Sequence, residues 1–304
     1  MIEIGHTIQC MPPASSTQVS PKQFAQAIGV SESSIKRWAD EGRFPMIRTA
    51  GGHRRIAIED AIRFVREAQM DIVEPDAIGL TELEPVRAGS HIDRGERIRD
   101  LLVRGESEEY RAALLSAYLG GESLDRLCDG PIRSAMVKVG ELWLESDRGI
   151  FEEHRTTALA VTGMIQLGLL LGSQADRPLA LGGAIRNDHS QLATLMASFV
   201  LKDTGFRTLN LGANTPANSF HHAIDTHEPG LVWVSANHVE DGEQTLVEVE
   251  SIISHAQAKN VPVVLGGRGV PLFIGQVPSG LETVQSMGEL AAFGKGILRG
   301  HGVR

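Results

Sequence analysis

The sequence contains little cysteine and no long apolar run. Cys10 and Cys128 are the only cysteines among 304 residues, and they form no paired or CxxC spacing. A disulfide framework and a thiolate zinc site are therefore not expected, and a reducing compartment is favoured. The longest apolar stretch, residues 158–171, is interrupted by glycine and polar residues, whereas a membrane span needs roughly 20 apolar residues. We expect a cytoplasmic protein with no secretion signal and no membrane contact.

The sequence also lacks the patterns of common catalytic sites. It contains no convincing Ser-His-Asp set, no paired carboxylates and no Walker loop, so we do not expect an enzyme. The length of 304 residues predicts two or three domains.

Positive charge is scarce overall but concentrated near the N-terminus. The formal net charge is -9, yet residues 33–55 hold six basic residues against Asp40 and Glu41. A local cationic patch on an acidic protein indicates a DNA-binding module, because attraction to phosphate acts over about a Debye length. The six are Lys36, Arg37, Arg43, Arg48, Arg54 and Arg55.

The patch falls on elements that predict a winged helix-turn-helix over residues 17–72, after a flexible tail at 1–16. Ser20, Pro21 and Gln23 form a capping signal for a first helix that ends at Gly29. Ser31 caps a second helix, 31–40, with Ile35 and Trp38 facing inward. Residues 46–56 predict two short strands around Gly51-Gly52, with positive φ at both glycines. A further helix is expected at 59–69.

The rest of the chain predicts two more parts. Residues 73–92 contain scattered proline, glycine and acids, which we interpret as a linker. Residues 93–175 predict a four-helix bundle with helices at 94–103, 107–119, 123–143 and 151–171. Residues 176–304 predict a flavodoxin-like parallel sheet with strands at 179–185, 208–211, 231–235, 261–265 and 281–286. The expected fold class is multidomain α and α/β.

Two motifs in the N-terminal part, SESSIKRW and TAGGHRRI, resemble the DNA-binding domain of the MerR family. On this resemblance the second helix enters the major groove of double-stranded operator DNA, and the wing contacts phosphates or the minor groove. A solvated basic surface with another partner is the alternative. The candidate DNA-binding residues are Ser34, Lys36, Arg37, His53, Arg54 and Arg55.

The remaining two-thirds of the chain resembles the cobalamin-binding region of photoreceptors of the CarH and LitR type. GELW at 140–143 is followed, after nine residues, by Glu153-His154, as in that family. The resemblance implies that Trp143, Glu153 and His154 cover the upper face of adenosylcobalamin, with Ile150 packed against the adenosyl group. Taken alone, Trp143 is as well explained as a core residue.

The same resemblance assigns a lower axial cobalt ligand and a site for the nucleotide tail. The family places a histidine after the first strand, in the pattern acidic residue, any residue, His, two residues, Gly. His189 stands there, but Asn187 and Leu192 replace the acid and the glycine. We expect the Asn187 side-chain oxygen to accept the ring N–H of His189. The residues implied to contact the tail are the LNLGANTP segment at 209–216, Ser235, Gly266 and Gly267.

One position departs from the light-responsive members. They have a second histidine directly after the upper-face tryptophan, whereas this chain has Leu144, which cannot coordinate cobalt.

The expected function is a transcription regulator, most simply a repressor, controlled by adenosylcobalamin and light through a homo-oligomer, a dimer or tetramer. No other metal is expected. One alternative is a MerR-like regulator that binds haem, or binds no cofactor and responds to a protein partner. Another is a corrinoid carrier for methyl transfer, which the winged helix disfavours.

Overall fold

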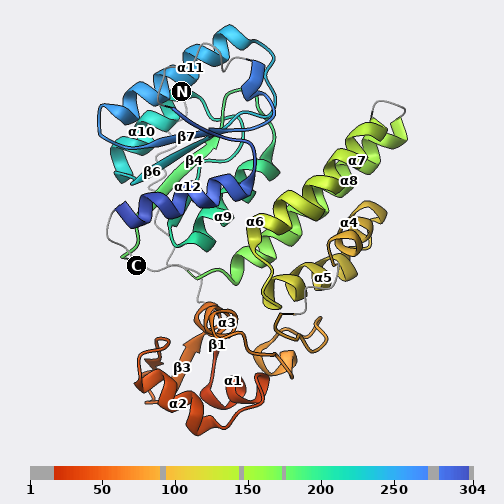
Figure 1. The fold of residues 1–304 in the computed structure, drawn as a ribbon, viewed down its shortest axis with the longest axis vertical. Helices are drawn as coiled ribbons and strands as arrows, with labels where there is room; N and C mark the ends of the chain where they lie inside the picture. Colours follow the sequence, from red (N-terminus) through yellow and green to blue (C-terminus); the bar gives the residue numbers. More distant parts are fainter. Residues whose placement is uncertain (1–16, 90–93, 144–146, 173–175, 273–280, 301–304) are drawn as a thin grey trace, which may run out of the picture. The chain divides into compact units, whose positions relative to one another are not determined.

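The computed structural model describes residues 17–89, 94–143, 147–172, 176–272 and 281–300. The chain separates into two compact units, Met1–Ala88 and Gly89–Arg304. Each is coloured continuously along the sequence in Figure 1, the first in red to orange and the second in yellow to blue. The boundaries at residues 72, 92 and 175 stay predictions. No described helix is long and apolar enough to cross a membrane.

The first unit contains the expected helix pair, strand pair and following helix. Both predicted caps are present: the Ser20 hydroxyl accepts a bond from the Gln23 amide, and the Ser31 hydroxyl accepts one from the Ser34 amide. The sheet is antiparallel with the order β1-β3-β2. The elements are β1 (Gln18–Val19), α1 (Pro21–Ala27), α2 (Glu32–Asp40), β2 (Ile47–Arg48), β3 (Arg54–Ala57) and α3 (Ile58–Glu67).

An aromatic cluster forms the core of this unit. The rings of Phe24, Phe44 and Phe64 meet edge to face with centroids 4.9 to 6.1 Å apart. Trp38 lies 5.4 Å from Phe64, and the Arg43 guanidinium lies over both of these rings. The second helix is therefore anchored through its inward side chains, which leaves its outer face to solvent.

The wing turn differs from the expected two-residue hairpin. Only Gly52 has positive φ, at +79°. The Gly52 amide bonds to the Thr49 carbonyl, and the Thr49 amide bonds to the His53 carbonyl, so the turn spans residues 49–52. A longer loop built on an ordinary β-turn needs one left-handed residue at its end, not two.

The segment expected to be a linker is folded as far as it is described. Ile72 pairs with Val86, and a 3-10 helix, η1 (Pro75–Ile78), lies between them. The Val73 amide bonds to the carbonyl of Ala27 at the end of α1. Ile72, Ile78, Leu83 and Val86 are all buried. These apolar residues have no helical or strand period, which is why the sequence pattern concealed their packing.

The second unit begins with the predicted bundle, but its third helix is interrupted. Cys128–Ile132 forms a π-helical turn that contains Pro131. Proline has no amide hydrogen and clashes with the preceding turn, so the ordinary helix cannot continue through it. The helices are α4 (Arg94–Arg104), α5 (Ser107–Leu119), α6 (Leu124–Leu127), α7 (Arg133–Trp143) and α8 (Asp147–Leu169).

Glycine at residue 163 sets how closely α8 approaches α5. A Cβ at this position would lie 2.6 Å from the ring of the buried Tyr110. We expect Gly163→Ala to lower the free energy of unfolding by about 1 to 2 kcal/mol, because overpacking outweighs the gain in helix propensity. Gly140→Ala in α7 is the matched control: its Cβ meets nothing within 4 Å, so it should be neutral or stabilising. Denaturant unfolding of both variants tests this, and equal effects would contradict it.

A five-stranded parallel sheet forms the remainder of the second unit, in the order β5-β4-β6-β7-β8. This is the flavodoxin-like order predicted from the sequence. Helices α9 and α12 cover one face, and α10 and α11 cover the other (Figure 1). The strands are β4 (Leu179–Ala184), β5 (Arg207–Asn210), β6 (Leu231–Ser235), β7 (Val263–Gly266) and β8 (Glu282–Val284). The helices are α9 (Gln191–Thr204), α10 (Ala217–His227), α11 (Gly242–Gln257) and α12 (Met287–Gly300).

Defined polar contacts join the bundle to the sheet helices within this unit. The Asp129 carboxylate accepts bonds of 2.9 Å from the amides of Met287 and Gly288, at the first turn of α12. The Tyr118 hydroxyl donates to Asp203 near the end of α9, at 2.7 Å. A carboxylate at a helix N-terminus satisfies amides that have no partner within the helix.

Candidate functional site

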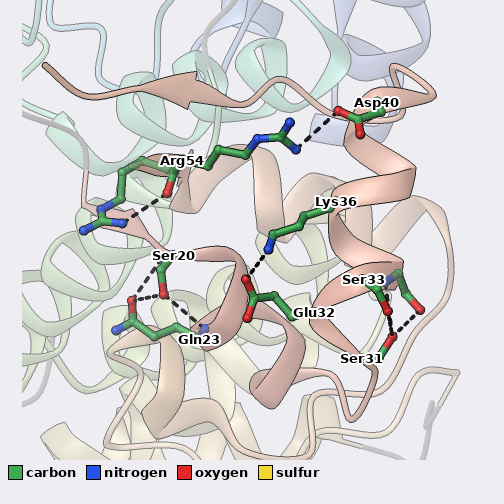
Figure 2. A network of polar contacts seen from close by, with 10 residues as sticks. Ser20, Gln23, Ser31, Glu32, Ser33, Lys36, Asp40 and Arg54 are labelled. Carbon is green, nitrogen blue, oxygen red and sulfur yellow. Dashed lines mark hydrogen bonds and ion pairs between the residues drawn. The ribbon is translucent and has the colours of Figure 1, made fainter. Parts of the chain in front are cut away.

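The basic residues of α2 alternate with acids along one helix face. The Lys36 ammonium lies 2.7 Å from the Glu32 carboxylate, and the Arg37 guanidinium lies 3.7 Å from Glu41. All four side chains are well exposed to solvent. Exposed pairs of this kind contribute little stability, so both cations remain available to another anion. Figure 2 shows Lys36 directed back along the helix toward Glu32.

Arg54 and Arg55 of the wing lie on β3, and His53 directly precedes this strand. Arg54 reaches from β3 to Asp40 at the end of α2, with 3.3 Å between Nη1 and Oδ1 (Figure 2). The Arg55 guanidinium donates to the carbonyl of Arg54 at 3.1 Å. His53 is exposed at the start of the strand. The ion pair between Arg54 and Asp40 ties the wing to the second helix.

Together these elements enclose a groove on the first unit. It is lined by the first turn of α1, the outer face of α2 and the strand of the wing. Five of the six candidate DNA-binding residues are exposed or half-buried: Lys36 and Arg37 on α2, Arg54 and Arg55 on β3, and His53 directly before β3. Ser34 is the exception, because its hydroxyl bonds to Ser31 within the helix cap. The lining residues are Ser20, Pro21, Lys22, Glu32, Lys36, Asp40, Gly52, His53, Arg54 and Arg55.

His189 occupies the loop that follows β4, at the carboxyl edge of the parallel sheet. Its side chain is exposed, and within the described residues its ring makes no hydrogen bond or ion pair. The loop itself is firmly held. The neighbouring Asp188 is fully buried, and its carboxylate accepts the amides of Ser190 at 2.9 Å and Asn237 at 2.6 Å.

Asp188 and Asn237 were not identified from the sequence, although they fix this edge. The Asn237 side-chain amide donates to the Ser235 hydroxyl at 2.9 Å, so one network joins the loops after β4 and β6. An acidic residue beside His189 was the only available signal. His238, exposed in the same loop after β6, is a second imidazole at this edge.

Asn187 has a different role from the one expected. Its φ is +63°, and its backbone amide donates to the Asn214 side chain at 2.8 Å. No bond from its side chain to His189 is formed in the described part of the chain. Asparagine tolerates the left-handed region, so this residue shapes the loop. Leu192, in the first turn of α9, is buried and points into the fold.

The residues assigned to a nucleotide tail contact other parts of the fold. Ser235 is buried and bonded to Asn237. Gly267 has φ of +126°, and a Cβ there would lie 2.2 Å from the carbonyl oxygen of Ala236. At Gly266 a Cβ would lie 3.0 Å from Val284. Internal packing alone therefore requires glycine at 267 and favours it at 266.

The candidate upper-face residues lie on the helical hairpin of α7 and α8. Trp143 ends α7; its side chain and Leu144 lie outside the described part of the chain. On α8, Glu153 accepts a bond from Thr157 at 2.9 Å and lies 3.6 Å from the well-exposed His154. Ile150 is also exposed. No hydrogen bond or ion pair in the described part joins this group to His189.

These observations test whether the residues fit a corrinoid. A free, exposed imidazole on a rigid loop is a suitable cobalt ligand, so His189 fits the lower face of the ring. The α8 residues offer an apolar side chain and hydrogen-bonding groups to an upper face. Ser235, assigned to the nucleotide tail, is buried, and its hydroxyl accepts a bond from Asn237.

The fold and the site define a class of protein. A winged helix-turn-helix head precedes a unit with the helical plus parallel-sheet fold of B12-binding proteins. Residues 95–167 match the family model of the B12 binding domain. The sequence resemblance inferred for both parts is thereby confirmed in its general outline.

Two known proteins show how far the likeness extends. The chain is 25% identical over 279 residues to the HTH-type transcriptional repressor CarA of Myxococcus xanthus, covering 89% of this chain and 94% of that protein. Its fold is similar to the monomethylamine corrinoid protein of Methanosarcina barkeri, with a TM-score of 0.51 and 14% identity. That match covers 66% of this chain and 96% of the other.

Proposed function

We propose that this chain is a DNA-binding transcriptional repressor whose second unit responds to a corrinoid. The observation that supports it most is the combination on one chain of a cationic groove between α2 and the wing with a free imidazole at the sheet edge. The likeness to a transcriptional repressor extends over both units. The B12 binding domain match supports a regulator with a cobalamin input over one without a cofactor.

The first experiment selects the operator sequence and tests in the same assay whether a corrinoid changes DNA binding. The purified full-length chain would be used to enrich duplexes from a random library, with and without adenosylcobalamin. A recovered sequence whose affinity changes with the corrinoid supports both parts of the proposal. If a sequence is recovered but its affinity does not change with the corrinoid, the proposed response to a corrinoid is contradicted. If no sequence is enriched, the proposed DNA binding is contradicted.

The finer proposal concerns which corrinoid is bound and what it changes. Adenosylcobalamin would supply a light-sensitive cobalt–carbon bond beside Ile150 and Glu153. His189 would hold the lower face, while Trp143 and His154 exclude water from the upper one. Joining the bundle to the sheet in this way would favour a dimer or tetramer, which raises DNA affinity through effective concentration without new contacts.

Leu144 makes the expected light response unusual. Without an imidazole at this position, illuminated protein should release its corrinoid readily, because no second protein ligand is available there. We expect Leu144→His to retain a several-fold larger fraction of corrinoid after green light. The measurement is the absorbance that co-elutes with protein in gel filtration, with dark samples of both proteins as controls. Equal retention by wild type and variant would show that another residue, with His154 the first to test, holds the cobalt.

A further inference from the structure

The interior between the sheet and α9 is filled by one large side chain. Trp233, in the middle of β6, is 2% exposed. It belongs to one buried core cluster with Ala197 and Leu201 of α9 and with Leu290 and Leu298 of α12. The Trp233 Nε1 donates to the Thr194 hydroxyl at 3.1 Å, which donates in turn to the Asn210 side chain at 3.0 Å. The indole is therefore fixed by packing and by a complete chain of hydrogen bonds.

The neighbouring strand, β4, has a glycine next to this indole. Gly182 of β4 lies directly opposite Trp233 in the sheet. A Cβ at Gly182 would lie 2.3 Å from the Trp233 ring and 2.1 Å from its carbonyl oxygen. Such distances are far below any real contact, so only glycine leaves the indole its space. Glycine at 182 therefore leaves room for both the backbone and the indole of Trp233.

The filled space lies behind the candidate ligand site. Side chains alternate along a strand, so Trp233 and Ser235 point to the same face of the sheet. Ser235 lies opposite Ala184 at the carboxyl edge, where the loop to His189 begins. A nucleotide tail attached to a corrin ring at His189 would pass Ser235 on its way into the space between the sheet and α9. There it would meet the Trp233 indole. The bicyclic indole takes the volume that a bicyclic nucleotide base would need.

We propose that the sheet domain of this protein admits no nucleotide tail, and that Trp233 closes the space where such a tail would lie. The ligand class is then a corrin ring that lacks the nucleotide or keeps it outside the fold. The inference rests on the proposed function only for the binding of a corrinoid at His189. With its base not buried, the dimethylbenzimidazole of cobalamin competes with His189 for cobalt. A corrinoid without a base, such as cobinamide, has no such competitor.

The test compares two probes on the full-length wild-type protein. Dissociation constants for aquocobinamide and aquocobalamin would be measured by spectral titration. We expect cobinamide to bind at least as tightly as cobalamin. Cobalamin binding more than threefold tighter than cobinamide would overturn the proposal, because a buried tail adds contacts that cobinamide cannot make. If neither binds wild type, the corrinoid input of the proposed function fails, and the variants below decide whether the tail space is closed.

Removing the Trp233 ring should shift the binding preference from cobinamide toward cobalamin. Trp233→Gly, and Trp233→Ala if the first is unstable, should bind cobalamin at least tenfold tighter relative to cobinamide than wild type does. Phe220→Ala is the matched control, since it removes a buried ring from the opposite face of the sheet; its ratio should equal that of wild type. Folded Trp233 variants that keep the wild-type ratio, or that bind neither probe, would show that this interior is not where a tail would lie.

Discussion

Replacing both Arg54 and Arg55 with alanine is expected to weaken operator binding by roughly 30-fold and to lower the salt slope by about two. Both guanidiniums border the groove beside α2. Among the residues that the structure describes, Arg54 pairs with the exposed carboxylate of Asp40, an interaction that contributes little stability. In the complex a DNA phosphate would take the place of this carboxylate. The variant therefore loses the contact with the phosphate but keeps its fold.

The control for this experiment removes the same charge elsewhere. Arg104 and Arg126 are exposed on the second unit, where they form surface ion pairs with Glu106 and Glu122. Their double alanine variant changes the net charge equally and should leave both affinity and salt slope near wild type. Affinity would be measured at several salt concentrations on the selected duplex. An equal loss of affinity in both double variants would indicate a general effect of net charge. It would contradict a direct contact between the wing and DNA.

Local signals in the sequence predicted most elements of the fold. The capping residues Ser20 and Ser31 marked helix starts because they satisfy free amides whatever the surroundings. Continuous apolar runs marked strands that are buried on both faces, and the strand 231–235 was predicted with its observed bounds. Such signals act within a few residues, so a single sequence shows them.

Features that depend on distant packing were not predictable in this way. The burial of Ile72, Ile78, Leu83 and Val86 within the first unit follows no period along the chain. The need for glycine at 182 arises from the next strand, where the backbone carbonyl oxygen and the indole of Trp233 would lie 2.1 and 2.3 Å from a Cβ. The contacts of Ser235 with Asn237 and of Gly267 with Ala236 are likewise visible only in the folded chain, and the assignment of these residues to a nucleotide tail stays a prediction.

The position of His189 was predictable, but the means of holding it was not. A histidine directly after the first buried strand of a parallel sheet must lie at the carboxyl edge, where ligands bind such folds. The support comes from Asp188, whose carboxylate satisfies two amides from two loops. That role requires the loop after β6 to be adjacent, which only the folded chain reveals.

His189→Ala is expected to weaken corrinoid binding by about 100-fold, because it removes the only protein ligand proposed for cobalt; even partners one shell further out contribute 10 to 100-fold to metal affinity. The fold should be unaffected. The imidazole is exposed and unbonded within the described residues, and surface changes of this kind stay within about 0.5 kcal/mol of the wild-type free energy of unfolding. Cobinamide is the better probe, since no base of its own competes for the vacated coordination position.

The matched control is His227→Ala, an exposed histidine at the end of α10. Since α10 runs back from the carboxyl edge, its end lies at the opposite edge of the sheet, and this variant should bind like wild type. Binding would be followed by spectral titration, because a change of axial ligand shifts corrinoid absorbance even where affinity is kept. An unaltered spectrum and affinity in His189→Ala would assign cobalt to another group. His238, on the adjacent loop of the same edge, would then be the next imidazole to replace. Loss of the bound-corrinoid spectrum in His238→Ala would assign the cobalt ligand to the loop after β6 instead of the loop after β4.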